Sequence, residues 1–321
     1  MIRRLLVLAA VLPLLAYSVA LARPGDVKLN VMVLSGTTGL SLVKILEDNP
    51  NIGPGIAATY TVAKSPDVVV SRLVSGEADV AALPTNTAAL LYNRGVPVQI
   101  AAITNWGVTY VVGSDSSIAD WKGLRGKEIA VAGRGATPDI LLRYVLKANG
   151  LNPDADVRIQ YYSSPVELAQ LVIAGRVRVA ALPEPWVTEV MRNNASARIL
   201  LDYQEEWRRI ESRKESYPQS CLVVRTQFAR DNPGIVREFL KLAESSSSWV
   251  VSHPEQAGAL AEAHVQISRE AARDSIPRCN LRFAGMATAG REVEHFLSRL
   301  LAFDPQSIGG KLPDAGFYWN E

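Results

Sequence analysis

The residues best suited to chemistry lie mainly in four short loops rich in glycine, threonine and asparagine. Glycine lets the backbone approach a bound molecule closely, the first N–H groups of a helix favour an anionic or strongly polar group, and Thr and Asn add neutral donors and acceptors. These types predict a site that holds a small molecule by hydrogen bonds with little fixed charge. The candidate ligand-binding residues are Ser35, Gly36, Thr37, Thr38, Thr85, Asn86, Asn105, Trp106, Gly135, Ala136, Thr137, Glu184 and Trp186.

Each candidate also has a purely structural explanation. Gly and Thr before a helix commonly form only a cap and a turn. Trp186 also suits the core and Glu184 the surface, while Trp106 and Tyr110 suit either a flat face for a ligand or packing at a hinge. The binding interpretation is favoured because the same loop positions recur in two parts of the chain.

Catalytic and metal-binding patterns are missing from the sequence. The histidines, His253, His264 and His295, all lie in the C-terminal part, outside the four loops. The chain has no C-x-x-C pair, no G-x-S-x-G and no H-E-x-x-H motif. We therefore expect no catalytic residues, no metal site and no cofactor.

Two stretches of the chain match each other without gaps at a constant offset of 99 residues. A constant offset over several separated matches indicates two similar structural units, which ordinary α/β sequence would not explain. The matches are Lys28 with Lys127, Gly36 with Gly135, Thr38 with Thr137, Leu42 with Leu141, Ser65-Pro66 with Ser164-Pro165, Gly76 with Gly175, and Val80–Pro84 with Val179–Pro183.

Each unit is predicted to fold as strand, loop, helix, strand, helix and strand. The apolar runs at 29–34 and 128–132 are strand candidates, and those at 79–83 and 177–182 are short buried strands that end at a proline. Thr137 is a candidate N-cap, and Ser164 with Glu167 forms a capping box. This pattern predicts mainly parallel sheets, in which ligands bind beyond the carboxyl ends of the strands, where the four loops lie.

The chain is predicted to cross between the two units twice, at the strand-like runs 101–112 and 221–224. We therefore expect an α/β fold of two lobes joined by a two-strand hinge, with a helical C-terminal region that covers the first lobe. The predicted boundaries are 23–109 plus 222–321 for lobe one and 110–221 for lobe two.

The first 22 residues have the pattern of an export signal. Arg3 and Arg4 precede an apolar run at 5–16 that is short for a membrane span, and Ala20-Leu21-Ala22 fits the small-x-small cleavage pattern. The alternative is a membrane anchor or a buried helix. We expect segment 1–22 to be cleaved near Ala22 and the mature protein to be periplasmic.

Composition narrows the classes of partner. A chain of 321 residues suffices for two domains, and 48% apolar with 21% charged residues predicts an ordered globular protein. The net charge falls from +2 to about zero without Arg3 and Arg4, so nucleic acid is not an expected partner. Monomer is the default oligomeric state.

The two cysteines form an even pair, which in an exported chain often becomes a disulfide. We predict a bridge between Cys221 and Cys279, and two buried free thiols are an equally weighted alternative.

The chain resembles the NMT1/THI5-like and NitT/TauT-type substrate-binding proteins of ABC transporters. The resemblance implies a type II periplasmic-binding-protein fold, lobes that close about a hinge, and a membrane permease as partner. Ligands of that family are diverse: sulfonates, nitrate-like anions, and pyrimidine or vitamin precursors. The resemblance rests on Gly36 to Leu40, Leu73-Val74-Ser75-Gly76-Glu77-Ala78-Asp79, Trp121-Lys122-Gly123-Leu124-Arg125-Gly126-Lys127, Leu182-Pro183-Glu184-Pro185-Trp186, and 304–313.

These expectations predict an extracytoplasmic solute-binding protein, not an enzyme, that delivers a small organic molecule to an ABC importer. The ligand would be a planar heterocycle or vitamin precursor, or a small organic anion such as a sulfonate. One alternative is an enzyme of the same fold acting on a pyrimidine-like substrate, which in the THI5 branch needs a cysteine cluster and reactive histidines. The other alternative is a ligand sensor that works without a transporter.

Overall fold

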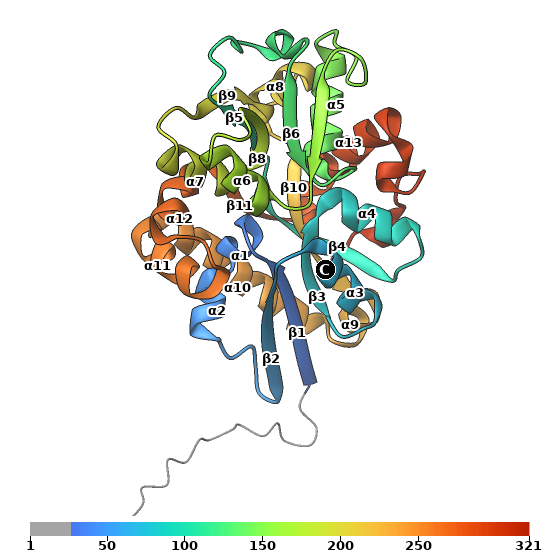
Figure 1. Ribbon diagram of the computed structural model, residues 1–321. Helices are drawn as coiled ribbons and strands as arrows, with labels where there is room; N and C mark the ends of the chain where they lie inside the picture. The colour runs from blue at the N-terminus through green and yellow to red at the C-terminus, as the bar shows by residue number, and fades with distance from the viewer. Residues whose placement is uncertain (1–26, 321) are drawn as a thin grey trace, which may run out of the picture.

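Two β-sheets, each covered by helices, form two lobes (Figure 1). A computed structural model describes residues 27–320, so the predicted signal at 1–22 lies outside the described residues. None of the helices within 27–320 combines the length and apolar character needed to cross a bilayer.

The sheet of the first lobe has six strands: in spatial order, β11 (Leu281–Gly285), β4 (Val98–Trp106), β10 (Pro218–Arg225), β3 (Val80–Pro84), β1 (Val27–Leu34) and β2 (Ile56–Ala63). β1 pairs in parallel with β2 and β3, and β10 lies antiparallel between β3 and β4. Because helices cover both faces, the first four residues of β3 are buried, which explains its continuous apolar sequence.

The sheet of the second lobe has five strands: β7 (Arg158–Tyr162), β6 (Glu128–Ala132), β8 (Val179–Pro183), β5 (Thr109–Gly113) and β9 (Arg198–Asp202). β6 pairs in parallel with β7 and β8, and β5 lies antiparallel between β8 and β9. The carboxyl ends of the parallel strands in both sheets therefore carry the four predicted loops.

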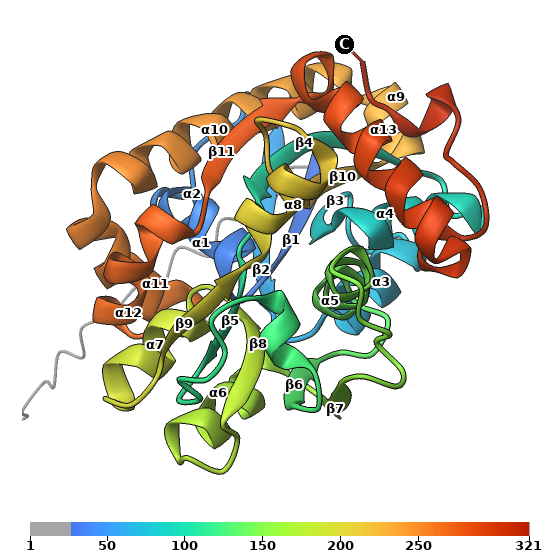
Figure 2. The same ribbon diagram turned by 90° about the horizontal axis from the view of Figure 1, so that it is seen from above.

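Helices pack around both sheets (Figure 2). Those of the second lobe are α5 (Thr137–Ala148), α6 (Pro165–Ile173), α7 (Trp186–Asn193) and α8 (Tyr203–Glu211), with the 3-10 turn η1 (Trp121–Leu124). Those of the first lobe are α1 (Thr37–Ser41), α2 (Val43–Asp48), α3 (Pro66–Val74), α4 (Thr85–Asn93), α9 (Thr226–Asp231), α10 (Pro233–Ser252), α11 (Pro254–Val265), α12 (Arg269–Ser275) and α13 (Met286–Phe303), with η2 (Ile276–Arg278), η3 (Pro305–Ile308) and η4 (Ala315–Phe317).

The two repeat units have the same structure. Helices α3 and α6, and strands β3 and β8, begin and end at positions that differ by the offset found in the sequence. Both helices are followed by a glycine with positive φ, 78° at Gly76 and 69° at Gly175. Ser164 caps α6 by accepting the N–H of Glu167, as the capping-box pattern predicts.

The chain crosses between the sheets twice, and the two crossings touch. Strand β4 ends at Trp106 in the first sheet and β5 begins at Thr109 in the second, so the predicted run 101–112 is two strands with a break at Gly107. The return crossing lies at 212–217, ahead of β10, and the N–H of Gly107 donates to the carbonyl of Tyr217 there. The predicted fold of two α/β lobes with a helical C-terminal region is confirmed.

Candidate functional site

The loops after β3 and β6 meet between the two sheets. A side-chain hydrogen bond crosses this junction: Thr137 Oγ1 donates to Asn86 Oδ1 at 2.7 Å. Thr137 is 1% and Asn86 3% exposed, so the bond is buried between the lobes. The structure thus brings together two of the predicted binding residues from opposite lobes.

This bond corrects the predicted role of Thr137 as a helix cap. Ala136 is the N-cap of α5, its side chain makes no capping bond, and Thr137 is the first helical residue. The hydroxyl of Thr137 is therefore free of the capping role and reaches α4 of the other lobe. The connection is specific to the side chain, because alanine at this position would keep the helix but lose the bond.

The loop before α1 supplies one free hydroxyl. Ser35 donates to the carbonyl of Val265 at 2.7 Å and Thr38 donates to the carbonyl of Leu34 at 2.9 Å, so both side chains hold the loop in place. Thr37, 8% exposed, makes no side-chain hydrogen bond to any residue in 27–320. Its hydroxyl is the group of this loop that is available to a bound molecule.

Two further predicted residues, Thr85 and Asn105, are fully buried at the ends of β3 and β4. Thr85 Oγ1 and Asn105 Nδ2 have no nitrogen or oxygen partner among the described residues, although the thiol of Cys221 lies close to Thr85. Burying a donor without an acceptor is unfavourable. These groups can therefore be satisfied by a polar ligand or by water.

The backbone N–H groups ahead of α5 are less available than the sequence suggests. The N–H of Gly135 donates to the carboxylate of Asp139 at 2.8 Å, and the N–H of Ala136 donates to the carbonyl of Gly133 at 3.1 Å. Asp139 is buried and also accepts from Arg143 and Tyr161. A carboxylate therefore already occupies the helix start that we expected to receive an anionic ligand.

The two candidate tryptophans lie in different surroundings. Trp106 is 4% exposed, its Nε1 donates to the carbonyl of Arg282, and the Arg282 guanidinium lies 4.2 Å from the ring centroid. These contacts favour the packing role that the sequence left open. Trp186 begins α7, is half-buried, and packs beside the apolar core of the second lobe.

Glu184, at the end of β8, is fully buried and joins the lobes. Its carboxylate accepts the N–H and the hydroxyl of Thr188 in α7, and Arg278 Nε of the first lobe donates to it at 2.5 Å. Burial raises the pKa of Glu184, and the neighbouring Arg278 opposes that rise. Glu184 is thus held by protein partners on each of its oxygens.

Arg278, the partner of Glu184, is a candidate site residue that the sequence analysis missed. It lies in η2, within the C-terminal region that we expected to be structural cover, and 94 residues separate it from Glu184. Arg278 Nη2 also donates to Thr188 Oγ1 at 2.6 Å, and Tyr110 Oη donates to the carbonyl of Arg278. No local pattern in the sequence marks this arginine, because its partners are brought to it only by the fold.

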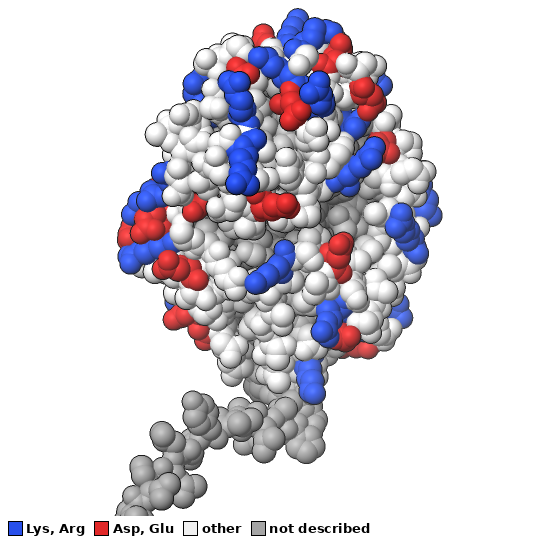
Figure 3. Space-filling model, in the orientation of Figure 1, with Lys and Arg blue, Asp and Glu red and all other residues white. Residues whose placement is uncertain are grey.

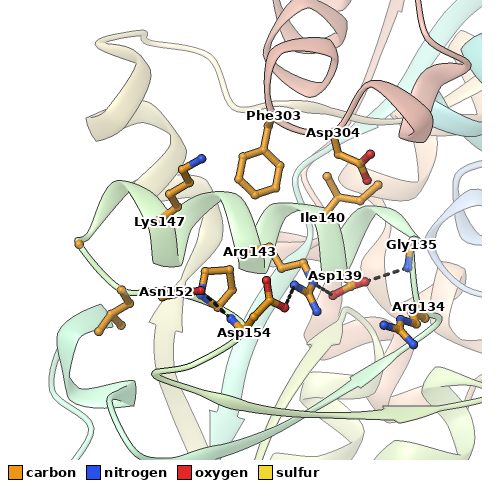
Figure 4. Close-up of a pocket in the computed structure, with 13 residues that line it drawn as sticks. Arg134, Gly135, Asp139, Ile140, Arg143, Lys147, Asn152, Asp154, Phe303 and Asp304 are labelled. Atoms are coloured by element: carbon orange, nitrogen blue, oxygen red, sulfur yellow. Dashed lines mark hydrogen bonds and ion pairs between the residues drawn. The ribbon is translucent and has the colours of Figure 1, made fainter.

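A pocket of about 810 Å³ flanks the junction along α5 (Figure 4). Arg143 binds Asp139 and Asp154 along its floor, and Lys147 lies 5.6 Å from the Phe303 ring of the first lobe. Because Arg143 is already paired with two carboxylates, we place the candidate site at the strand ends, which share Gly135 with the pocket. The pocket is lined by Arg134, Gly135, Asp139, Ile140, Arg143, Lys147, Gly150, Leu151, Asn152, Pro153, Asp154, Phe303 and Asp304.

The predicted disulfide is not present: Cys221 and Cys279 are buried free thiols. Cys221 lies in β10, between β3 and β4, and packs in one apolar cluster, whereas Cys279 packs with α11 and α12 in a separate apolar cluster. Their separate surroundings explain why no bridge forms. Burial raises the pKa of the Cys221 thiol to about 12 and also raises that of Cys279.

The outer surface carries charges of both signs. Figure 3 shows Lys and Arg interspersed with Asp and Glu over the visible face of both lobes. Within residues 27–320, no group of three or more His, Cys, Asp or Glu side chains is arranged to hold a metal ion.

Comparison with known proteins gives consistent matches. The family model for "ABC transporter, phosphonate, periplasmic substrate-binding protein" matches residues 42–275. The nitrate/nitrite binding protein NrtA of Synechococcus elongatus is 27% identical over 135 residues, which are 41% of this chain and only 28% of that protein.

Two solved structures share the fold over nearly the whole chain. An ABC transporter structure from Parabacteroides distasonis is 29% identical with a TM-score of 0.79, covering 92% of this chain and 100% of that one. The periplasmic aliphatic sulphonate binding protein SsuA from Escherichia coli is 15% identical with a TM-score of 0.76, covering 93% of each chain.

Proposed function

The chain belongs to the family of ABC-transporter phosphonate periplasmic substrate-binding proteins, and we propose that it captures one small organic molecule between its lobes and delivers it to an importer in the membrane. The family implies an extracytoplasmic location. The observation that carries the proposal is the buried Asn86–Thr137 hydrogen bond, which joins the lobes beside the strand-end loops. Lobes that touch there can enclose a molecule from both sides.

The polar groups at the junction support a ligand held mainly by neutral hydrogen bonds. We assign the ligand contacts to Thr37, Thr85, Asn86 and Asn105 of the first lobe and to Thr137 of the second, all of which are buried polar residues. A small organic anion such as a sulfonate, or a planar heterocycle of the vitamin-precursor kind, suits such donors. The finer NMT1/THI5-like and NitT/TauT-type assignment belongs to this proposal, as does the monomeric state.

Binding is favoured over catalysis because the histidines have other partners. His264 Nε2 lies 2.7 Å from Glu47 Oε2, His295 Nε2 lies 2.9 Å from Glu211 Oε2, and His253 Nδ1 lies 3.0 Å from the carbonyl of Trp249. None of these three contacts involves a strand-end loop residue. Both thiols are buried, and burial raises the pKa of each, so neither is readily ionised to a nucleophilic thiolate.

The test is to identify the molecule that co-purifies with periplasmically expressed protein by mass spectrometry, and then to measure its binding. Ligand at a hundredfold excess over Kd should add about 2.7 kcal/mol to the free energy of unfolding. Asn86→Ala should weaken binding at least tenfold, whereas the exposed Gln256→Ala serves as the matched control and should bind as wild type does. Equal binding by Asn86→Ala and wild type, or turnover of the co-purified molecule, would contradict the proposal.

A further inference from the structure

Arg278 forms an ion pair with Glu184, which lies in a strand-end loop of the opposite lobe. Among the ion pairs of the described residues, no other arginine pairs with such a loop. Arg278 reaches from η2 of the first lobe to Glu184 at the end of β8. Because β8 and β6 are neighbours in the second sheet, Glu184 and the Gly133–Thr137 loop lie side by side at that sheet's edge. Arg278 therefore lies at the same junction as Thr137.

The segment that carries Arg278 is anchored on several sides. The carbonyl of Arg278 accepts from Tyr110 Oη, and the side chain of Asn280 donates to the carbonyl of Gly107 at the hinge. Helix α12, just before it, contacts α7 through the Arg192–Asp274 ion pair. The guanidinium is thus placed by the backbone on either side of it as well as by its own bonds.

Arg278 has donors left over. A guanidinium carries five N–H groups in a fixed fork. Nε donates to Glu184, and Nη2 donates to Thr188 Oγ1 and, at 3.4 Å, to the carbonyl of Asp274. These bonds use one edge of the fork, while the side chain as a whole is 32% exposed. Nη1 has no hydrogen-bond partner among the described residues, so this edge of the partly exposed fork is left for a further acceptor.

The charge balance favours an acceptor at that edge. The carboxylate of Glu184 is fully buried behind the guanidinium, so its charge is turned away from the accessible side. A partly desolvated guanidinium forms charge-assisted bonds to oxyanions that are shorter and stronger than neutral ones. Arg134, the cation of the β6 loop, is instead exposed, with its guanidinium 5.2 Å from the Tyr161 ring.

We propose that Arg278 is the specificity-determining residue that binds the oxyanion of the ligand through its Nη1 edge, and that Glu184 is the positioning residue that holds the guanidinium toward the junction. This inference rests on the proposed function. Carboxylates, sulfonates and phosphonates share the required chemistry, and Thr37 and Asn86 would bind the remaining polar atoms of the ligand.

The experiment measures preference for an anion over its neutral isostere. Isothermal titration calorimetry would compare ethanesulfonate with ethanesulfonamide, propionate with propionamide, and ethylphosphonate with its dimethyl ester. Wild type should bind the anion of at least one pair at least tenfold more tightly, and the identity of that pair distinguishes the three oxyanion classes.

Two variants separate recognition from folding. Arg278→Met with Glu184→Gln removes both charges, avoids a buried unpaired carboxylate, and should reduce the preference to under threefold while unfolding as wild type does. Arg278→Lys, which keeps the positive charge, should retain part of the preference for the anion. Arg192→Met, which breaks a lobe-bridging ion pair on the same flank, is the control and should keep the full preference.

The inference is overturned if the double variant keeps the wild-type preference, or if wild type binds a co-purified neutral molecule and prefers no anion; in the latter case the proposed function stands. If wild type binds neither a co-purified molecule nor any compound of the panel, the proposed function falls together with the inference.

Discussion

The loop after β3 and the loop after β8 follow the same five-residue strand sequence, yet they join the lobes by different chemistry. After β3, Asn86 forms a neutral hydrogen bond with Thr137. After β8, Glu184 forms a buried charged network with Thr188 and Arg278. The repeated strand thus determines where each loop lies, whereas the side chain that follows it determines how strongly the lobes are held together there and what the loop can bind. We call the Asn86–Thr137 contact the neutral flank and the Glu184–Arg278 contact the charged flank.

The largest expected effect comes from breaking the charged flank. Arg278→Met leaves the buried carboxylate of Glu184 without its cation and should lower the free energy of unfolding by about 3 kcal/mol. Denaturant titration measures this loss. Arg192→Met, whose ion pair with Asp274 is much more exposed, is the control and should cost about 1 kcal/mol or less.

The same variant should respond to pH. Burial already raises the pKa of Glu184, and without Arg278 the opposing effect is gone, so the pKa rises further. A raised folded-state pKa means that the native protein holds the proton more tightly than the unfolded chain. The deficit of Arg278→Met should therefore shrink as the pH falls from about 8 to about 5, and a deficit that grows on acidification would contradict this account.

A smaller effect is expected from the paired glycines that open the equivalent loops. Gly36 has φ 109° and ψ −153°, a conformation nearly confined to glycine, whereas φ at Gly135 is 74°. An added Cβ meets no atom within 4 Å at either position, so only backbone strain remains. We expect Gly36→Ala to cost about 2 kcal/mol and Gly135→Ala about 1 kcal/mol in unfolding free energy. The reverse order, measured by denaturant titration, would contradict backbone strain as the cause of the loss.

The Asn86–Thr137 hydrogen bond of the neutral flank should contribute less to stability than the Glu184–Arg278 ion pair. In a double-mutant cycle, Asn86→Ala and Thr137→Ala should show a coupling of about 1 kcal/mol, because each single change breaks the same hydrogen bond. Additive losses would mean that the bond contributes nothing to the joined arrangement of the lobes. Small-angle scattering of the double variant should show a larger radius of gyration than that of wild type.

The two thiols should not react with a thiol reagent in the native state. Cys221 and Cys279 are fully buried, so a thiol reagent should modify neither in folded protein and both in protein unfolded without reductant. Fewer than two reactive thiols per unfolded chain would restore the disulfide predicted from the sequence.

The sequence predicted the features that depend on local pattern. The constant offset located α3 with α6 and β3 with β8, and Gly76 and Gly175 marked both helix ends. The pattern also placed Asn86 and Thr137 in strand-end loops of different units, although it did not indicate that their side chains bond each other.

The features that the sequence missed depend on pairing over long separations. Arg278 and Glu184 meet only after both lobes are assembled, and Arg282 covers Trp106 through a fold-level contact. The return crossing at 212–217 carries no strand pattern, so the predicted crossing was placed on the apolar residues of β10, which lie wholly in the first sheet.

The position of β10 has a consequence for the order in which the chain becomes structured. Strand β4 pairs only with β10 and β11 among the strands of the first sheet, and β3 borders β10 on one side, so both keep a bare edge until residue 218 has been made. The second lobe has no such dependence, because all of its strands lie between Thr109 and Asp202. During synthesis the middle of the chain can therefore collapse first, while β4 and one edge of β3 wait for β10. Such unpaired edges invite association with other chains.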